Sequence, residues 1–193
     1  MNKFDDARVS FYLENRDLID EWAKISDEVP GLCRKFMWSL KEDLKELATQ
    51  MGSAISVYEE RSSYPKLFLY REHWFSAGDS KFEGRIDAGI GVEWNKNNVD
   101  FGLSGNRPYV GVWTNKRTDR GSQLREDLEK TIGEGSSNSF WVKWERMAPT
   151  EEIWWENLDS YREVLVESID NEWEEYSEAI EEAVTQLRAP RTT

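Results

Sequence analysis

The region from Trp154 to Leu187 constrains the fold most strongly, because apolar residues recur there every three or four positions. This spacing keeps one face of a helix apolar over nearly the whole region. It predicts one very long amphipathic helix, or two helices that are separated near residues 157–160. A helix with such a stripe can pack on the core or pair with a second copy of the chain.

Helical spacing is also present near the N-terminus. Apolar residues predict one amphipathic helix over residues 14–27, after a short extended start at residues 9–13. A second helix is expected to begin at Pro30 and to end near Gly52, a residue type that is common just after a helix. Together these two segments predict an αα-hairpin that packs on the core.

The middle of the chain has the alternating pattern of strands, with a period of about 2 in place of about 3.6. Residues 118–132 interrupt it with a further predicted helix. The predicted strands are residues 55–57, 66–71, 85–94, 99–103, 109–114 and 140–145. We therefore expect an α+β fold in which an antiparallel sheet of about five or six strands is flanked by the N-terminal helical hairpin and the long C-terminal acidic helix.

A chain of 193 residues, 13% of them aromatic, is long enough for one compact domain and too rich in aromatic residues to be disordered. We expect one α+β domain over residues 1–193. Its parts are the helical hairpin at residues 1–52, the sheet with one helix at 53–148, the long acidic helical region at 149–187 and a tail at 188–193.

The sequence favours a cytoplasmic protein with no membrane segment. Its apolar runs are far shorter than the roughly 20 residues of a membrane-spanning helix, and its first residues lack the pattern of a secretory signal. The one cysteine, Cys33, cannot form an internal disulfide and is expected to be a small buried apolar side chain. The one histidine, His73, excludes a metal site built from several histidines.

Acidic residues are concentrated near the C-terminus. The formal net charge is −13, and residues 151–193 hold 13 Asp and Glu against 3 Lys and Arg. Such a chain repels phosphate, so direct binding of nucleic acid is not expected. The predicted binding residues for a basic partner are Glu163, Glu167, Asp170, Glu174, Glu175, Glu178, Glu181 and Glu182, with no Lys or Arg among them along the helix.

Two interpretations of this acidic helix stay open. The charge can serve general solubility, or it can form a surface for a basic partner. The second favours an interaction protein without catalytic activity or cofactor, such as an inhibitor or nucleic-acid mimic that acts on a nucleic-acid-processing or defence protein. A homodimer through the apolar stripe of the same C-terminal helix is a further expectation.

Glycines line one face of the predicted strands. Gly89 and Gly91 alternate there with Asp87 and Glu93, and neighbouring strands add Asp100, Gly102 and Gly111. A row of glycines weakens a strand unless a bend or a close contact compensates. The row predicts either a bent or closely covered sheet, or a groove rimmed by acids.

Asp87, the strand that follows it, Glu93 and Lys96 resemble the acid and Glu-x-Lys arrangement of the PD-(D/E)xK nuclease-like superfamily, and the overall texture resembles uncharacterised phage and prokaryotic proteins near it. Asn95 stands at the family's lysine position, one residue before Lys96. The resemblance implies, as the alternative function, a metal-dependent nuclease-like domain. In that alternative Asp87 and Glu93 hold Mg²⁺ and Lys96 orients the attacking water.

A short basic segment contains Lys116, Arg117, Arg120 and Arg125 at the start of a predicted helix. Amide groups at a helix start attract anions, so a phosphate is one expectation for this segment. A solvated loop whose charges offset nearby acids is the other.

Overall fold

The computed structural model describes residues 6–75, 86–95, 107–132, 137–138, 140–147 and 157–188. The helices are α1 (Ala7–Glu14), α2 (Arg16–Met51), α3 (Asp119–Ile132) and α4 (Leu158–Arg188), with a short 3-10 turn η1 (Glu72–Trp74). The strands are β1 (Ile55–Glu60), β2 (Lys66–Arg71), β3 (Ala88–Glu93), β4 (Tyr109–Thr114) and β5 (Trp141–Arg146).

The five strands form one antiparallel sheet in the order β1-β2-β3-β4-β5. Strands that follow one another in the chain thus lie side by side in the sheet, although only β1 and β2 are joined by a short connection, residues 61–65, and residues 115–140 between β4 and β5 include α3. The α+β class, the antiparallel sheet and the long C-terminal helix are therefore confirmed. The predicted strand at residues 99–103 and the start of the predicted C-terminal helix before residue 157 lie outside the described residues.

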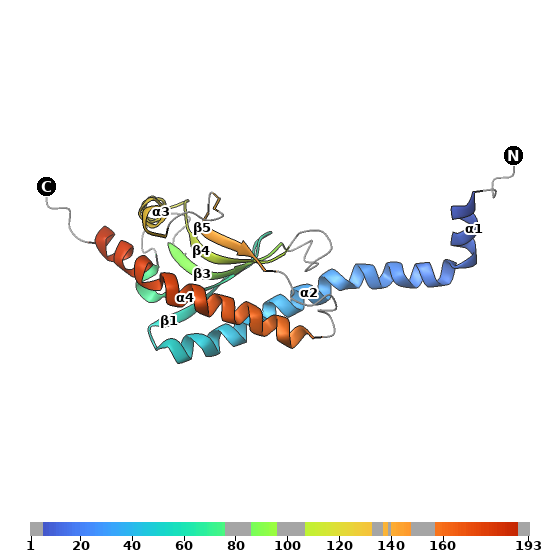
Figure 1. Ribbon diagram of the computed structural model, residues 1–193, viewed down its shortest axis with the longest axis horizontal. Helices are drawn as coiled ribbons and strands as arrows, with labels where there is room; N and C mark the ends of the chain where they lie inside the picture. Colours follow the sequence, from blue (N-terminus) through green and yellow to red (C-terminus); the bar gives the residue numbers. More distant parts are fainter. Residues whose placement is uncertain are drawn as a thin grey trace.

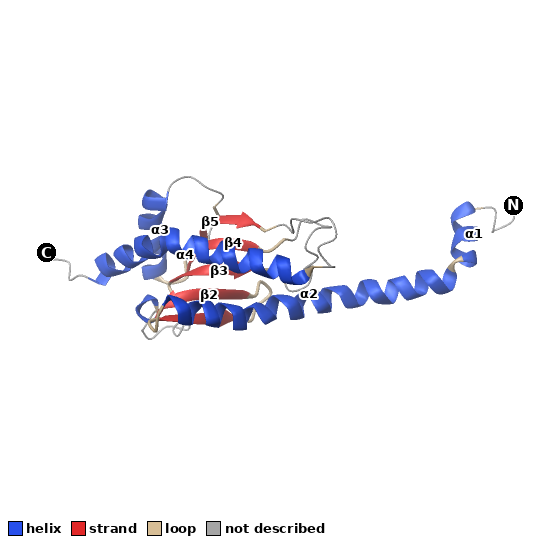
Figure 2. Cartoon of the chain, turned by 60° about the horizontal axis from the view of Figure 1, so that its bottom comes forward, coloured by secondary structure: helices blue, strands red, loops and turns tan. Residues whose placement is uncertain are grey.

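Helices cover one face of the sheet. Inward side chains of β2, β3 and β4, among them Leu69, Ile90 and Val112, share one core cluster with residues of α2, α3 and α4. Figure 2 shows α4 lying across the sheet beside the C-terminal half of α2. Cys33 belongs to this core and is 5% exposed, as the sequence predicted.

The apolar stripe of α4 is the part of that helix that faces the sheet. Leu165, Ile169, Ile180 and Val184 are fully buried, and Trp173 stacks on Trp74 of η1 at 5.4 Å between ring centroids. The three- and four-residue spacing thus produces a core layer. Because the sheet of the same chain covers this stripe, the structure does not support the expected homodimer through it.

The N-terminal helices differ from the expected boundaries. Residues 9–13 are helical within α1, and the two helices meet at Asn15, whereas Pro30 lies inside α2. Proline removes one hydrogen bond from a helix interior, which normally ends or kinks it. Here the apolar spacing continues in phase on both sides of Pro30, so one helix satisfies both halves of the pattern.

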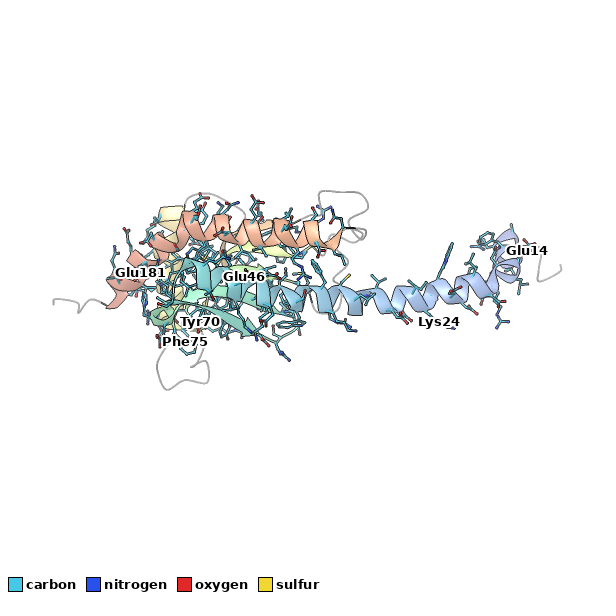
Figure 3. All side chains as sticks on the ribbon, turned by 90° about the horizontal axis from the view of Figure 1, so that it is seen from below. Glu14, Lys24, Glu46, Tyr70, Phe75 and Glu181 are labelled. Carbon is cyan, nitrogen blue, oxygen red and sulfur yellow. The ribbon has the colours of Figure 1, made fainter. Side chains whose placement is uncertain are left out.

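The N-terminal half of α2 projects away from the body of the molecule, with α1 at its far end (Figure 1). Figure 3 labels Lys24 and Glu14 on this projecting part, well away from the sheet. Within the described residues, no helix is long and apolar enough to cross a bilayer.

Candidate functional site

An acidic groove runs between α2 and α4, with a volume of about 360 Å³. Figure 3 labels Glu46 on α2 where that helix runs beside α4. Leu47 and Val166, both partly buried, supply apolar surface to the groove. Its carboxylates are Asp43, Glu46, Glu163, Glu167 and Asp170.

One cation lines this groove along with the carboxylates. Arg162 is 3.3 Å from Asp43 and 4.0 Å from Asp159, and its guanidinium lies over the Phe36 ring at 5.5 Å. These contacts hold it against α2. Glu46, Glu163 and Glu167 are exposed, so the groove keeps a strongly negative rim.

The expectation that the acids of α4 lack basic neighbours is wrong for its C-terminal half. Arg71 at the end of β2 is 2.8 Å from Glu178 and 3.0 Å from Glu181. His73 lies 2.6 Å from Glu181, and the Trp74 indole nitrogen donates to the same carboxylate at 3.0 Å. Two of the acids predicted to bind a partner therefore already contact basic side chains of the body.

These contacts change the chemistry of Glu181. Burial alone would raise its pKa, but the hydrogen bonds from Trp74, Arg71 and His73 outweigh burial and lower it. Figure 3 shows Glu181 near the end of α4. Of the other predicted binding residues, Glu174, Glu175 and Glu182 are exposed on α4 and do not line the groove.

Glu172 is an acid of α4 that was not among the predicted binding residues and points into the protein. It is 8% exposed, and its Oε2 atom has no hydrogen-bond partner among the described residues. Burial raises the pKa of Glu172 to about 7, although the Lys143 ammonium 3.9 Å away opposes this shift. Lys143 also donates to the hydroxyl of Tyr176.

Asp87 and Glu93 lie at opposite ends of β3 and do not form a carboxylate pair. Asp87 is fully buried, accepts a hydrogen bond from Thr118 at 3.1 Å and is 3.2 Å from Arg120. Six extended residues span about 20 Å, so one ion cannot bridge the two acids.

Glu93 has a separate environment. It is 3.3 Å from Lys66 and accepts a hydrogen bond from the Trp141 indole at 3.4 Å. Burial raises the pKa of Glu93, and Lys66 and Trp141 offset part of that shift. Lys96 lies outside the described residues, among which no group of three or more His, Cys, Asp and Glu side chains is placed to hold a metal. The structure therefore does not bring Asp87 and Glu93 together as one Mg²⁺ site, and a metal-dependent function stays a hypothesis.

The glycine row is explained by close backbone approach. A Cβ atom on Gly91 would lie 2.0 Å from the carbonyl oxygen of Leu67, and one on Gly111 would lie 2.2 Å from that of Lys143. Gly111 also has a φ of +156°, which side chains rarely adopt. Close backbone contact, one of the predicted explanations, thus accounts for both positions, and Asp100 and Gly102 lie outside the described residues.

An exposed apolar stripe that was not predicted lies on the projecting arm, by which we mean α1 and α2 up to Leu32. Its large apolar side chains are 37 to 62% exposed: Phe11, Tyr12, Leu13, Leu18, Trp22, Ile25, Val29 and Leu32. The last five alternate in steps of four and three, which is the heptad spacing of a coiled-coil seam. That spacing was visible in the sequence, but the exposure was not.

No protein-family model, curated protein or solved structure matches this chain.

Proposed function

We propose that this chain is a non-enzymatic interaction protein whose acidic groove between α2 and α4 binds a basic segment of another protein. The observation that carries the proposal is a groove lined by five carboxylates with apolar surface between them. A partner with exposed Lys and Arg side chains, such as a nucleic-acid-processing or defence protein, fits this surface. Inhibition by occupying its nucleic-acid site is the role we favour.

The apolar surface of the groove favours a basic protein segment as its ligand, in preference to a single metal ion or a small cation. Lys and Arg lay their aliphatic stems on apolar surface and keep the charged head in water. Leu47 and Val166 offer such surface, and the exposed carboxylates of Glu163 and Glu167, also on α4, lie at the rim of the groove. One bound Lys or Arg side chain can therefore make the apolar contact with its stem and the ionic contact with its head group.

A charge-reversal experiment tests the groove. The variant Glu163→Lys/Glu167→Lys/Asp170→Lys should bind a short arginine-rich peptide about tenfold or more weakly than the wild type, because rim charges steer and hold a basic ligand. Surface plasmon resonance at two salt concentrations measures the affinity and its salt dependence. Circular dichroism confirms that the fold is kept.

The matched control is Glu126→Lys/Glu174→Lys/Glu182→Lys, which makes the same change of net charge at exposed acids outside the groove. The control should keep most of the affinity. Equal weakening in both variants would mean that the total charge, and not the groove, attracts the peptide, and the proposal would fail.

We also propose that the interaction protein is a homodimer that pairs through the exposed stripe of the projecting arm. The stripe on α2 follows the heptad spacing over residues 18–32, which suits another helix as the occupant. The exposed parts of the eight large side chains, at roughly 100 Å² each, amount to the about 800 Å² per partner of a standard interface. A second copy brings an identical stripe of matching length.

A further inference from the structure

A second cavity, of about 650 Å³, opens on the sheet face that α2, α3 and α4 do not cover. Its volume is within the range of about 300 to 1,000 Å³ that is typical of small-molecule sites. It lies over the strands that carry Glu93 and Trp113, and residues from the segments after β1, after β4 and before β5 complete its walls.

Flat aromatic rings form one wall. Trp113 stacks on Phe68 at 5.1 Å and on Phe140 at 6.5 Å, and Trp141 packs edge-on against Phe68. Because the glycines of β3 and β4 have no side chains, these rings from neighbouring positions can converge above them. Trp113 and Trp141 are at most 4% exposed, so a planar ligand gains its stacking on the rings at the rim of this wall, the partly exposed Phe140 and the 53% exposed Tyr64.

Two donors in this cavity have no partner among the described residues. Trp113 is 4% exposed and its Nε1 is unpaired, and Asn115 is 2% exposed and its Nδ2 is unpaired. The Oδ1 atom of Asn115 accepts from the amide of Arg117, which fixes the side chain with its Nδ2 left over. Buried donors are costly unless they are satisfied, so both point to a ligand with acceptor atoms.

Two cations lie close to the Phe140 ring, which lines the same cavity. The ammonium of Lys116 is 4.5 Å from the centre of the Phe140 ring, and the guanidinium of Arg117, which lines the cavity, is 5.5 Å from it. Glu60, Glu93 and Lys66 line the cavity as well. An anionic group on a ligand is therefore best placed beside Phe140, where the two cations meet.

We propose that this cavity binds a nucleotide: the base stacks on the aromatic wall, its carbonyl or ring-nitrogen acceptors pair with Trp113 Nε1 and Asn115 Nδ2, and its phosphate lies beside Lys116 and Arg117. A nucleotide combines all three chemical features in one small molecule. The same chemistry is present in a free mononucleotide and in one residue of a single strand. This site is independent of the acidic groove, which lies among the helices on the other face.

Isothermal titration calorimetry with the four common nucleoside monophosphates tests the proposal. At least one should bind with a Kd of roughly 10 µM to 1 mM, and its nucleoside, which lacks the phosphate, should bind more weakly. A short homopolymeric single strand of the same base distinguishes the two sources. Tighter binding of the strand assigns the site to single-stranded nucleic acid, and equal or weaker binding assigns it to free nucleotides.

The variant Trp113→Phe removes one unpaired donor and keeps a ring in the wall. It should weaken nucleotide binding about three- to tenfold, the effect of one hydrogen bond. Its melting temperature should fall, because the buried ring loses packing against Phe68 and Phe140 when phenylalanine replaces tryptophan. The affinity is therefore measured well below the melting temperature, where a merely structural tryptophan would leave nucleotide binding by the folded variant unchanged.

Trp144→Phe is the matched control. Trp144 also has an unpaired indole nitrogen but does not line the cavity. This variant should bind nucleotides as the wild type does. The proposal is overturned if none of the monophosphates binds at millimolar concentration, or if the two variants change the affinity equally.

Discussion

Glu172 is a carboxyl group that the core of the protein keeps from ionising easily. Its folded-state pKa of about 7 is raised above its ordinary value of 4.5 by burial. A carboxyl group whose pKa is raised by folding makes its full contribution to the free energy of unfolding below its unfolded-state pKa. That contribution is lost as the pH rises through the folded-state pKa. The wild type should therefore lose stability at this residue between about pH 4.5 and pH 7.

The variant Glu172→Gln replaces the ionisable group with a neutral one of similar shape. At about pH 8 it should be more stable than the wild type by about 1 to 3 kcal/mol, and the gain should shrink towards about pH 5. Urea unfolding at several pH values measures this difference. Glu174→Gln, on an exposed residue of the same helix, should show no such trend.

Single residues also show what the sequence could not reveal. The pairing of Arg71 with Glu181 joins positions 110 residues apart, so the pattern along the helix gives no sign of it. The unpaired donors of Trp113 and Asn115 likewise depend on neighbours from other elements. Of the acids that line the groove, by contrast, Glu163, Glu167 and Asp170 follow from helical spacing on α4 and were among the predicted binding residues, whereas Asp43 and Glu46 of α2 were not.

At the scale of elements, the close packing of β3 and β4 in the sheet requires glycine at the position where the two strands pair. Gly91 and Gly111 lie directly opposite each other, and each would place a Cβ atom against a neighbouring backbone. Gly91→Ala should destabilise the protein by more than about 2 kcal/mol, since a backbone clash cannot be relieved by turning a side chain. Thermal melting measures the loss.

Gly31→Ala provides the contrasting substitution. A Cβ atom there would meet only the Arg34 side chain at an ordinary 3.7 Å, and the residue lies within α2. Alanine should therefore stabilise the helix by up to about 1 kcal/mol. If Gly91→Ala melted at the wild-type temperature, the close approach of β3 to β2 would not constrain the sheet.

Elements were predicted where one period of apolar residues extended over many positions. The strands from Lys66 to Arg71 and from Tyr109 to Thr114 and the helix up to Ile132 were confirmed within a residue or so. The prediction of separate helices before and after Pro30 was wrong. Proline was taken to begin a new helix, although the apolar stripe keeps the same helical phase on both sides of it.

At the scale of the whole molecule, the projecting arm decides the expected oligomeric state. Light scattering coupled to size-exclusion chromatography should give the mass of a dimer at about 100 µM, a concentration at which a modest interface is populated. Ile25→Glu, which places a charge in the stripe, should give the mass of a monomer. Light scattering is the right measurement because it reports mass without regard to the elongated shape.

Ala23→Glu is the control, because it adds the same charge at an exposed position two residues away and outside the stripe. It should remain dimeric. A wild-type protein that is monomeric at this concentration would contradict pairing through the arm. The sequence predicted apolar stripes on both α2 and α4, but only the fold decides which of them the sheet covers.

Pro30 and Gly31 lie close to the point where α2 leaves the body. Proline lacks the amide hydrogen that would tie this turn to residue 26, and glycine is the least restrained residue of a helix. The α2 arm beyond them is about 20 Å long, so a bend of about 10° moves its tip by about 4 Å. The bending stiffness of the arm therefore depends on these two neighbouring residues, and it sets how far the exposed apolar stripe moves relative to the body of the molecule.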